Sequence, residues 1–366
     1  MLDLIKIRQD LHRIPELGFA EHKTVKYLQD ILQQFPQLKI HHFDFPAIVA
    51  EYRVDDEAYK LFRADMDALP IAEQTGCDFA SEHAGKMHAC GHDLHMTILL
   101  GLIEQVLRRE MQQNILFVFQ PAEEGLGGAE RLIKTGIFQN YQISECYALH
   151  VNGAFPVGTV ASKPGIFFAN TRELELTFRG VSAHVAFPEK GRDALAAGVD
   201  FYAQLQRELL ERFPQPGSVI CGLGQMSAGT VMNAVPDFCT FHGTIRAFST
   251  ADHQKLKRLV EKLAARVAQE HQLKAEVQWH AFYKEVNNSL QLYQKFQQIL
   301  KISAYELIES PAVFTGEDFG FFAAQYPGLL FWLGADSGSS EDLHSAKFLP
   351  AAAAIEVGVD LLSRLV

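Results

Sequence analysis

Two patterns of hydrophobic and polar positions run along this chain, and they predict two kinds of element. Nearly unbroken apolar runs, typical of strands buried on both faces, occur at 48–54, 60–70, 114–125, 145–151 and 328–335. Apolar residues at helical spacing occur at the N-terminus and at 93–111, 127–138, 289–302, 318–326 and beyond Pro350. Because strands and helices alternate in this way in α/β proteins, we expect an α/β fold with a largely parallel sheet.

Two of these predicted helices carry a recognisable start signal. Asp93 stands at the start of 93–111 and is expected to be its N-cap, because a carboxylate there accepts hydrogen bonds from unpaired backbone amides. Pro350 is expected at the first position of the last helix, where its missing N–H costs nothing.

Between residues 170 and 283 the pattern changes to half-exposed strands in which apolar and polar residues alternate. Strands are expected at 171–180, 217–229, 237–248 and 274–283, and helices at 193–213 and 249–273, the latter capped by Ser249 or Thr250. The order β-α-β-β-α-β is that of ferredoxin-like α+β domains. We therefore expect a main domain of 1–169 and 284–366, with a second domain of 170–283 inserted in it.

Composition narrows the class of protein. The chain has 366 residues, 48% of them hydrophobic and 21% charged, and a formal net charge of -11. An acidic balance disfavours nucleic-acid binding, and no apolar run is long enough to span a membrane. The first residues form an amphipathic pattern without a signal-peptide core, and the five cysteines are scattered and odd in number. We expect a cytoplasmic protein without a disulfide framework.

Residues able to bind a metal follow several of the predicted strands. In an open α/β sheet, ligands gather beyond the carboxyl ends of the strands. The polar side chains found at such positions, or just before the helix at 93–111, are Asp65, Asp67, Cys90, His92, Glu123, Glu124, His150 and His344. We expect these side chains to converge at one end of the sheet.

The stretch "MHACGHDLH" at 87–95 is the densest group of potential ligands. Cys90 and His92 are two residues apart, so in an extended segment both point to the same side. Thiolate and imidazole suit zinc, and carboxylates extend the range to manganese and cobalt. Two divalent ions, bridged by one sulfur, can polarise a carbonyl and produce hydroxide from water. The ligands of such a site would be Cys90, His92, Glu124, His150 and His344.

Other interpretations of this stretch remain. Cys90 is alternatively an apolar core residue, or a nucleophile, although a nucleophile leaves Glu123, Glu124 and His150 without a role. His88 and His95 either support the site or are structural histidines.

The adjacent carboxylates of Glu123 and Glu124 suggest a division of labour. One binds metal while the other takes a proton from water and passes it to the leaving nitrogen. We assign Glu124 to the metal and Glu123 to the proton, although spacing alone does not decide the order. Asp65 either binds metal or accepts a hydrogen bond beside the site.

Six motifs together resemble the M20 metallopeptidase superfamily, in its branch of amidohydrolases acting on N-acyl amino acids. They are "RADMDALPI", "MHACGHDLHM", "PAEEG", "SAHVAFP", "TGEDF" and "LHSAKF", and they occur in the family's order along the whole chain. The resemblance implies a Zn-peptidase-like catalytic domain with an inserted lid that serves as the dimerisation surface, giving a homodimer.

The resemblance also implies roles for individual residues. The five expected ligands match the family's two-metal centre, Glu123 its general acid/base, and Asp67 a catalytic aspartate that orients the site. In the inserted domain, His184 matches a histidine that donates to the developing oxyanion. Asn233 and Arg246 match positions that contact substrate, and Arg246 is a candidate clamp for a carboxylate.

Within this branch, the C-terminal motifs are most similar to those of N-acetyldiaminopimelate deacetylases of lysine biosynthesis. Relatives such as hippurate hydrolases more often carry proline where Ala346 stands. The loop before His344 departs from the pattern through extra serine and acidic residues. We expect a small N-acetyl amino acid as substrate and two divalent ions, whether manganese, zinc, cobalt or nickel. A broader aminoacylase, or a non-catalytic amino-acid-binding protein on the same fold, is the alternative.

Overall fold

The computed structural model describes residues 1–338 and 341–366. The chain divides into two compact units. The first unit comprises Met1–Phe167, Val286–Ala312 and Glu317–Val366, and the inserted unit comprises Phe168–Glu285 and Val313–Gly316. Residues 313–316 were expected in the main domain. They belong to the inserted unit because Arg246 donates to the Phe314 carbonyl, at 2.7 Å, and the Phe248 ring contacts the Phe314 ring.

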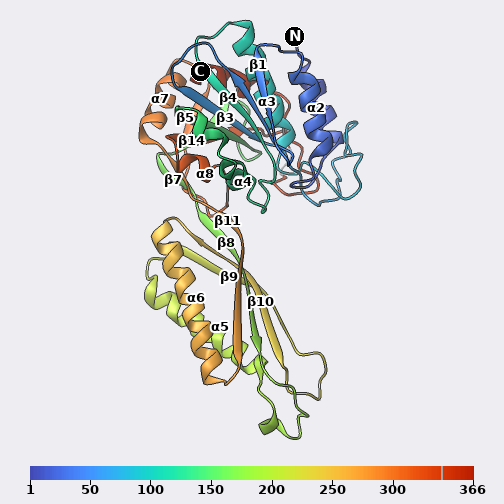
Figure 1. The fold of residues 1–366 in the computed structure, drawn as a ribbon, viewed down its shortest axis with the longest axis vertical. Helices are drawn as coiled ribbons and strands as arrows, with labels where there is room; N and C mark the ends of the chain where they lie inside the picture. Colours follow the sequence, from blue (N-terminus) through green and yellow to red (C-terminus); the bar gives the residue numbers. More distant parts are fainter. Residues whose placement is uncertain (339–340) are drawn as a thin grey trace. The chain divides into compact units, whose positions relative to one another are not determined.

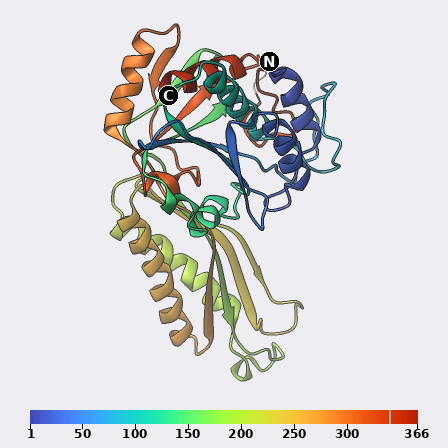
Figure 2. The ribbon, with the colours of Figure 1, turned by 45° about the horizontal axis from the view of Figure 1, so that its top comes forward.

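A mixed sheet of eight strands, within the described residues, organises the first unit (Figure 2). Its order is β1 (Leu38–His42), β2 (Ile48–Tyr52), β4 (Asn114–Gln120), β3 (Tyr59–Asp65), β5 (Ile143–Asn152), β14 (Gly328–Gly334), β6 (Thr159–Ser162) and β13 (Glu306–Glu309). The central strands β4, β3, β5 and β14 are parallel, as the apolar runs predict. The sheet as a whole is mixed, because β1, β2 and β6 join through antiparallel pairings.

Helices cover this sheet and complete the core. They are α1 (Leu4–Arg13), α2 (His22–Leu32), α3 (His92–Arg108), α4 (Gly128–Lys134), the short η1 (Ile137–Asn140), α7 (Leu290–Lys301), α8 (Gly320–Ala323) and α9 (Ala354–Leu365). A separate pair of short strands, β7 (Gly165–Phe168) and β12 (Val286–Asn288), lies outside the large sheet. Helix α3 is buried along most of its length, which places its N-terminus deep inside the unit.

Two predicted helix starts were wrong. The N-cap of α3 is Gly91, not Asp93, and Gly91 has a left-handed conformation with φ 81°. A Cβ at Gly91 would lie 2.4 Å from Val151 Cγ2, so glycine is also required by the close approach to β5. Asp93 instead accepts hydrogen bonds from Arg8 and His12. The last helix begins at Ala354 rather than Pro350.

The inserted unit has the predicted β-α-β-β-α-β order. It contains β8 (Asn170–Arg179), η2 (Pro188–Lys190), α5 (Ala194–Arg212), β9 (Val219–Ala228), β10 (Phe238–Ala247), α6 (Thr250–Glu270) and β11 (Lys274–Tyr283). The four strands form an antiparallel sheet in the ferredoxin-like order β11-β8-β10-β9, and α5 and α6 lie along one face (Figure 1). Ser249 caps α6, as predicted.

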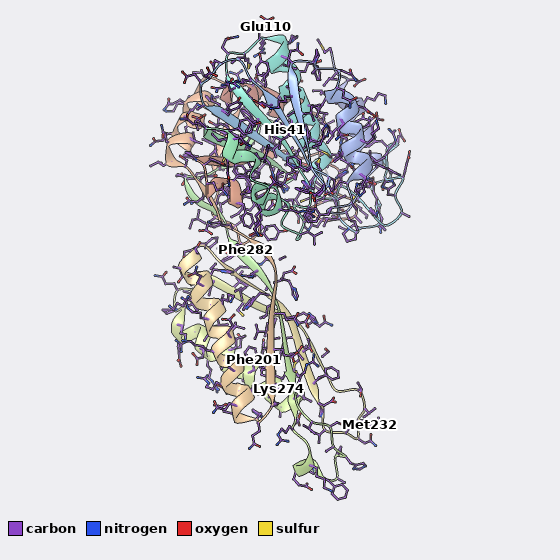
Figure 3. All side chains as sticks on the ribbon, in the orientation of Figure 1. His41, Glu110, Phe201, Met232, Lys274 and Phe282 are labelled. Atoms are coloured by element: carbon purple, nitrogen blue, oxygen red, sulfur yellow. The ribbon has the colours of Figure 1, made fainter. Side chains whose placement is uncertain are left out.

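The helix-covered face of this sheet forms the core of the inserted unit. Phe201 of α5 is fully buried there, together with Leu174 and Leu176 of β8 (Figure 3). At the other extreme, Met232 in the loop after β9 is fully exposed. In the described part of the chain, no helix combines the length and apolar character needed to cross a membrane.

Candidate metal centre

The five predicted metal ligands lie close together in the first unit. Cys90 Sγ lies 3.4 Å from His150 Nε2 and 3.3 Å from His344 Nε2. Ligand atoms of Cys90, His92 and His150 lie within 4.8 Å of one another, and so do those of Cys90, Glu124 and His344. Cys90 thus belongs to both groups, which is the position that a sulfur shared by two ions requires.

Backbone hydrogen bonds orient two of these histidines. The Nδ1 of His92, the first residue of α3, donates to the Asp67 carbonyl at 2.8 Å. In the same way, Nδ1 of His150 on β5 donates to the Val151 carbonyl at 2.8 Å. Each Nε2 is therefore left as a lone-pair donor facing the cluster. The buried Nε2 of His92 has no hydrogen-bond partner among the described residues, which fits a cation bound there.

Asp67 holds the turn that carries the paired glutamates. Its two carboxylate oxygens accept from the backbone amides of Glu123 and Glu124, at 3.0 and 2.9 Å. The turn after β4 also contains Ala122, whose φ of 55° is unusual for a residue with a side chain. Asp67 thus links the carboxyl ends of β3 and β4 and fixes where the two glutamates lie.

Neighbouring charges distinguish the two glutamates electrostatically. Burial, together with the nearby carboxylates of Glu317 and Glu124, raises the pKa of Glu123 well above its ordinary value. The pKa of Glu124 is lowered, because His344 and His92 outweigh its burial. A carboxyl group with a raised pKa is suited to exchanging protons, and an ionised one is suited to binding a cation.

A buried ion cluster that the motifs did not identify lies beside this pair. The guanidinium of Arg63 lies 2.7 Å from Asp65 Oδ2, 2.7 Å from Asp318 Oδ1 and 3.1 Å from Glu317 Oε1. All four side chains are buried. The available signal was a charged residue inside an otherwise apolar strand, together with the acidic pair of "TGEDF", but neither shows which charges meet.

Asp65 and His95 are hydrogen bonded within the protein. Asp65 Oδ1 accepts from His95 Nδ1 at 2.6 Å, and His95 Nε2 accepts from the Val151 amide at 2.9 Å. This arrangement agrees with the hydrogen-bonding interpretation of Asp65. His88 is also buried, but neither of its ring nitrogens has a partner in the described ranges 1–338 and 341–366.

The environment of Cys90 disfavours a nucleophilic thiolate. Burial, reinforced by the carboxylates of Glu124 and Glu123, raises the pKa of the Cys90 thiol well above its ordinary value. A reactive cysteine needs the opposite, an electropositive environment. A bound cation would reverse this balance, so the same surroundings favour a thiol that ionises only with metal present.

The three remaining predicted residues belong to the inserted unit. His184 and Asn233 are exposed and lie on paired segments, since the Val185 amide donates to the Asn233 carbonyl at 3.1 Å. Arg246 on β10 is half-buried, and its guanidinium donates to the Phe314 carbonyl.

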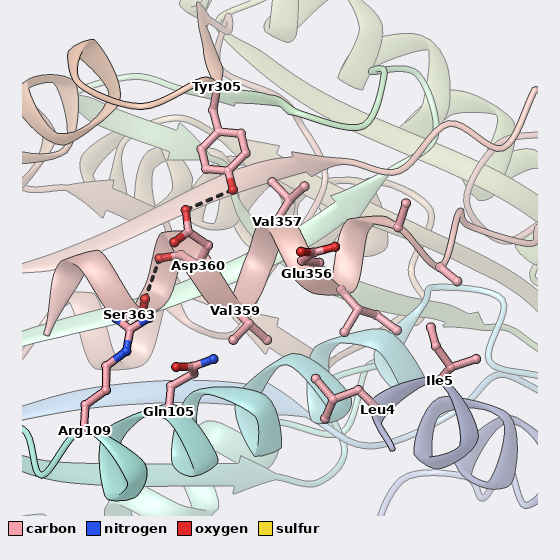
Figure 4. Close-up of a pocket in the computed structure, with 13 residues that line it drawn as sticks. Leu4, Ile5, Gln105, Arg109, Tyr305, Glu356, Val357, Val359, Asp360 and Ser363 are labelled. Carbon is pink, nitrogen blue, oxygen red and sulfur yellow. Dashed lines mark hydrogen bonds between the residues drawn. The ribbon is translucent and has the colours of Figure 1, made fainter. Parts of the chain in front are cut away.

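A hollow elsewhere in the first unit does not contain this chemistry. It has a volume of about 670 Å³ and lies between α1, α3 and α9 (Figure 4). Its lining, as far as the described residues show, includes Leu4, Gln105, Arg109 and Asp360 but none of the predicted metal ligands. The convergence of ligand atoms therefore identifies the site better than the size of a cavity.

The fold and the converging N, S and O ligands define a metal-dependent amidohydrolase. The chain belongs to peptidase family M20/M25/M40, whose model matches residues 61–366. It is 39% identical to the N-acetyldiaminopimelate deacetylases of Bacillus subtilis and Shouchella clausii, over 99% and 98% of this chain and 97% and 96% of theirs. The crystal structure of Bacillus subtilis YXEP protein, a dinuclear metal-binding peptidase from the M20 family, is 28% identical, with a TM-score of 0.85. That comparison covers 99% of this chain and 96% of the other.

Proposed function

We propose that this protein removes the acetyl group from N-acetyl-L,L-diaminopimelate, releasing acetate and L,L-diaminopimelate for lysine biosynthesis. The convergence of Cys90, His92, Glu124, His150 and His344 beside Glu123 carries the proposal. The full-length similarity to N-acetyldiaminopimelate deacetylases supports the choice of substrate.

In this proposal the five converging residues hold two divalent ions, drawn from zinc, manganese, cobalt and nickel. Cys90 belongs to both groups of ligand atoms, and the Nε2 atoms of His92 and His150 would be available to hold the ions. When bound, such ions polarise the amide carbonyl and lower the pKa of water. The thiol, imidazole and carboxylate donors suit this group of metals.

Glu123 carries the proton in the proposed reaction. It takes a proton from the attacking water and then delivers it to the departing amine, so that the same carboxyl acts as base and then as acid. Its buried position among other carboxylates stabilises the protonated form between the two steps. Asp67 positions Glu123 by accepting a hydrogen bond from the backbone amide of Glu123.

The inserted unit is proposed to complete the site. His184 would donate a hydrogen bond to the oxyanion as it forms. Asn233 and Arg246 would contact the substrate, and the guanidinium of Arg246 would bind the carboxylate of the substrate. We also propose that the protein forms a homodimer through this unit. Its proposed location is the cytoplasm.

The decisive experiment measures acetate release from N-acetyl-L,L-diaminopimelate and N-acetyl-methionine, and benzoate release from hippurate, with Mn²⁺ or Zn²⁺ added. We expect the highest kcat/KM on N-acetyl-L,L-diaminopimelate. A higher value on hippurate would assign the broader aminoacylase activity instead. No product from any of the three would favour a binding protein.

The variant Glu123→Gln separates catalysis from metal binding. It keeps the shape of the side chain but cannot accept the proton, so we expect kcat to fall by about 10²–10⁴-fold. Bound metal, measured after gel filtration, should match that of the parent protein. A variant that turned over substrate at the parental rate would refute the role of Glu123.

A further inference from the structure

The uncovered face of the inserted sheet carries a second group of metal-binding side chains. Strand residues alternate between faces, and Leu174 and Leu176 of β8 point to the helices. Glu175 between them therefore lies on the opposite face. His242 of β10 is its direct cross-strand partner. His280 comes from β11 on the other side of β8.

These three side chains converge on a single oxygen. Glu175 Oε2 lies 3.8 Å from His242 Nδ1 and 3.9 Å from His280 Nε2. Two ligands bound tetrahedrally to one zinc ion lie about 3.4 Å apart. Both histidines are about half exposed, so their side chains are free to rotate toward an ion shared with Glu175.

A hollow beside the two histidines provides an independent observation. It has a volume of about 580 Å³, and its lining includes His242, His280, Glu173, Gly222 and Gly224. A Cβ at Gly224 would meet no described atom within 4 Å, and one at Gly222 would make only ordinary contacts at 3.9 and 4.0 Å. Packing does not require glycine at either position. Glycine weakens a strand, and it often marks a place where a ligand approaches.

We propose that Glu175, His242 and His280 form a binding site for one divalent transition-metal ion on the inserted unit. Imidazole nitrogens with one carboxylate suit zinc, copper and nickel, whereas magnesium prefers oxygen ligands. The ion would link the adjacent strands β10, β8 and β11. Glu173, on the same face of β8, is available as a further ligand, and water from the hollow would fill the remaining positions.

The two tryptophans of the chain make this site separable from the catalytic cluster. Trp279 directly precedes His280, whereas the Trp332 ring lies 5.2 Å from the His150 ring. In the full-length Trp332→Phe variant, fluorescence therefore comes from Trp279 alone. Cu²⁺ is the probe, because a bound copper ion quenches a nearby indole. We expect saturable quenching that Zn²⁺ competes away and Mg²⁺ does not.

Variants then test the ligands. In the Trp332→Phe background, His242→Asn combined with His280→Asn should abolish the saturable quenching, and Glu175→Gln alone should weaken Cu²⁺ binding by at least tenfold. The matched control is His271→Asn, which removes a surface histidine that pairs with Asp200 at 3.1 Å. It should leave quenching unchanged. Quenching that persists in the double variant, or is absent from the parent, would overturn the proposal. Acetate release, which tests the proposed function, is measured separately and has no bearing on this metal site.

Discussion

At the scale of single residues, Arg63 determines how the acidic groups near the candidate centre coexist. One buried guanidinium contacts Asp65, Glu317 and Asp318. Without it, these three carboxylates would share a small buried volume and would lose the guanidinium that pairs with all of them. The glutamate proposed to carry the proton lies at the edge of the same cluster, since Arg63 partly offsets the rise in its pKa.

Replacement of Arg63 by methionine should be strongly destabilising. Methionine fills similar space but leaves three buried carboxylates without their partner, so we expect the free energy of unfolding to fall by about 3–5 kcal/mol. Urea denaturation measures the effect. Arg53→Met is the control, because Arg53 is exposed and its pairing with Asp56 should contribute little to stability. Equal losses in the two variants would contradict a special role for Arg63.

Residue type and position made part of the candidate site predictable. Glu124 and His150 lie at the ends of apolar runs, and Cys90 lies just before a helix, so the topology of an α/β sheet indicates that they meet. The pairing of Arg63 with Glu317 was not predictable. The two residues lie far apart in the sequence, and a charged residue gives the same local signal whether it is buried or exposed.

At the scale of elements, two neighbouring strands of the inserted unit carry glycines that differ in how much space a side chain would have. A Cβ at Gly243 on β10 would lie 2.3 Å from the backbone oxygen of Gly222 on β9, so only glycine allows the two strands to pair there. A Cβ at Gly224 on β9, in contrast, would have no described atom within 4 Å. Glycine is therefore required at one position and dispensable for packing at the other.

Alanine substitution should separate these two cases. Gly243→Ala must move the backbone of the paired strand, and we expect a loss of about 1–3 kcal/mol in stability. Gly224→Ala should be neutral or should stabilise by up to about 1 kcal/mol, because it restricts the unfolded chain. Chemical denaturation followed by Trp279 fluorescence compares them. A greater loss from Gly224→Ala would show that the described spacing is wrong.

Helix α1 is attached to α3 through a buried histidine. His12 Nδ1 lies 2.9 Å from Asp93 and Nε2 lies 3.2 Å from Glu73. Burial alone would lower the pKa of His12, but Asp93 and Glu73 outweigh it and raise the pKa to about 9. The imidazolium is therefore the form that the folded protein favours.

This contact predicts a specific dependence of stability on pH. A raised pKa in the folded state contributes stability that is complete below about pH 6.5 and is lost as the pH rises through about 9. The contribution is up to about 3 kcal/mol. Urea denaturation at pH 6.5 and 9.5 should show a smaller difference for His12→Gln than for the parent. His22→Gln, which changes an exposed histidine, should keep the parental difference.

Long elements were easier to predict from the sequence than short ones. The long helices 193–213 and 249–273 repeat their pattern over several turns, so α5 and α6 were found close to their observed bounds. Short strands such as β1 and β13 were missed, since four or five residues define no period. Helix α2 was also missed, although it has 11 residues. The start of α3 was misplaced because its cap depends on a tertiary contact of Gly91 with Val151.

At the scale of the whole molecule, each of the two units has a hydrophobic core of its own among the described residues. One spans the first unit from Ile7 to Leu365, and the other runs from Leu174 to Ala268 in the inserted unit. Units with their own cores tend to unfold independently. A ligand that binds only one of them should then stabilise only that one.

Metal addition should therefore shift one of two thermal transitions. The suitable protein carries His242→Asn and His280→Asn, which remove the second proposed metal site and leave the candidate centre around Cys90 intact. At a Zn²⁺ concentration about 100-fold above Kd, we expect the first unit to gain about 2.7 kcal/mol, with the other transition unchanged. Differential scanning calorimetry with and without a chelator measures both transitions. Adding Cys90→Ser should reduce the shift, and an equal shift of both transitions would contradict independent units.

The order of the strands in the large sheet has a consequence for biosynthesis. Strand β14 lies between β5 and β6, yet it is made after the whole inserted unit, and His344 is made later still. On the ribosome, residues 168–285 can emerge and collapse while the sheet of the first unit still lacks the strand that lies between β5 and β6. The cluster can be completed only when the final segment arrives. A truncated nascent chain therefore cannot assemble an active centre.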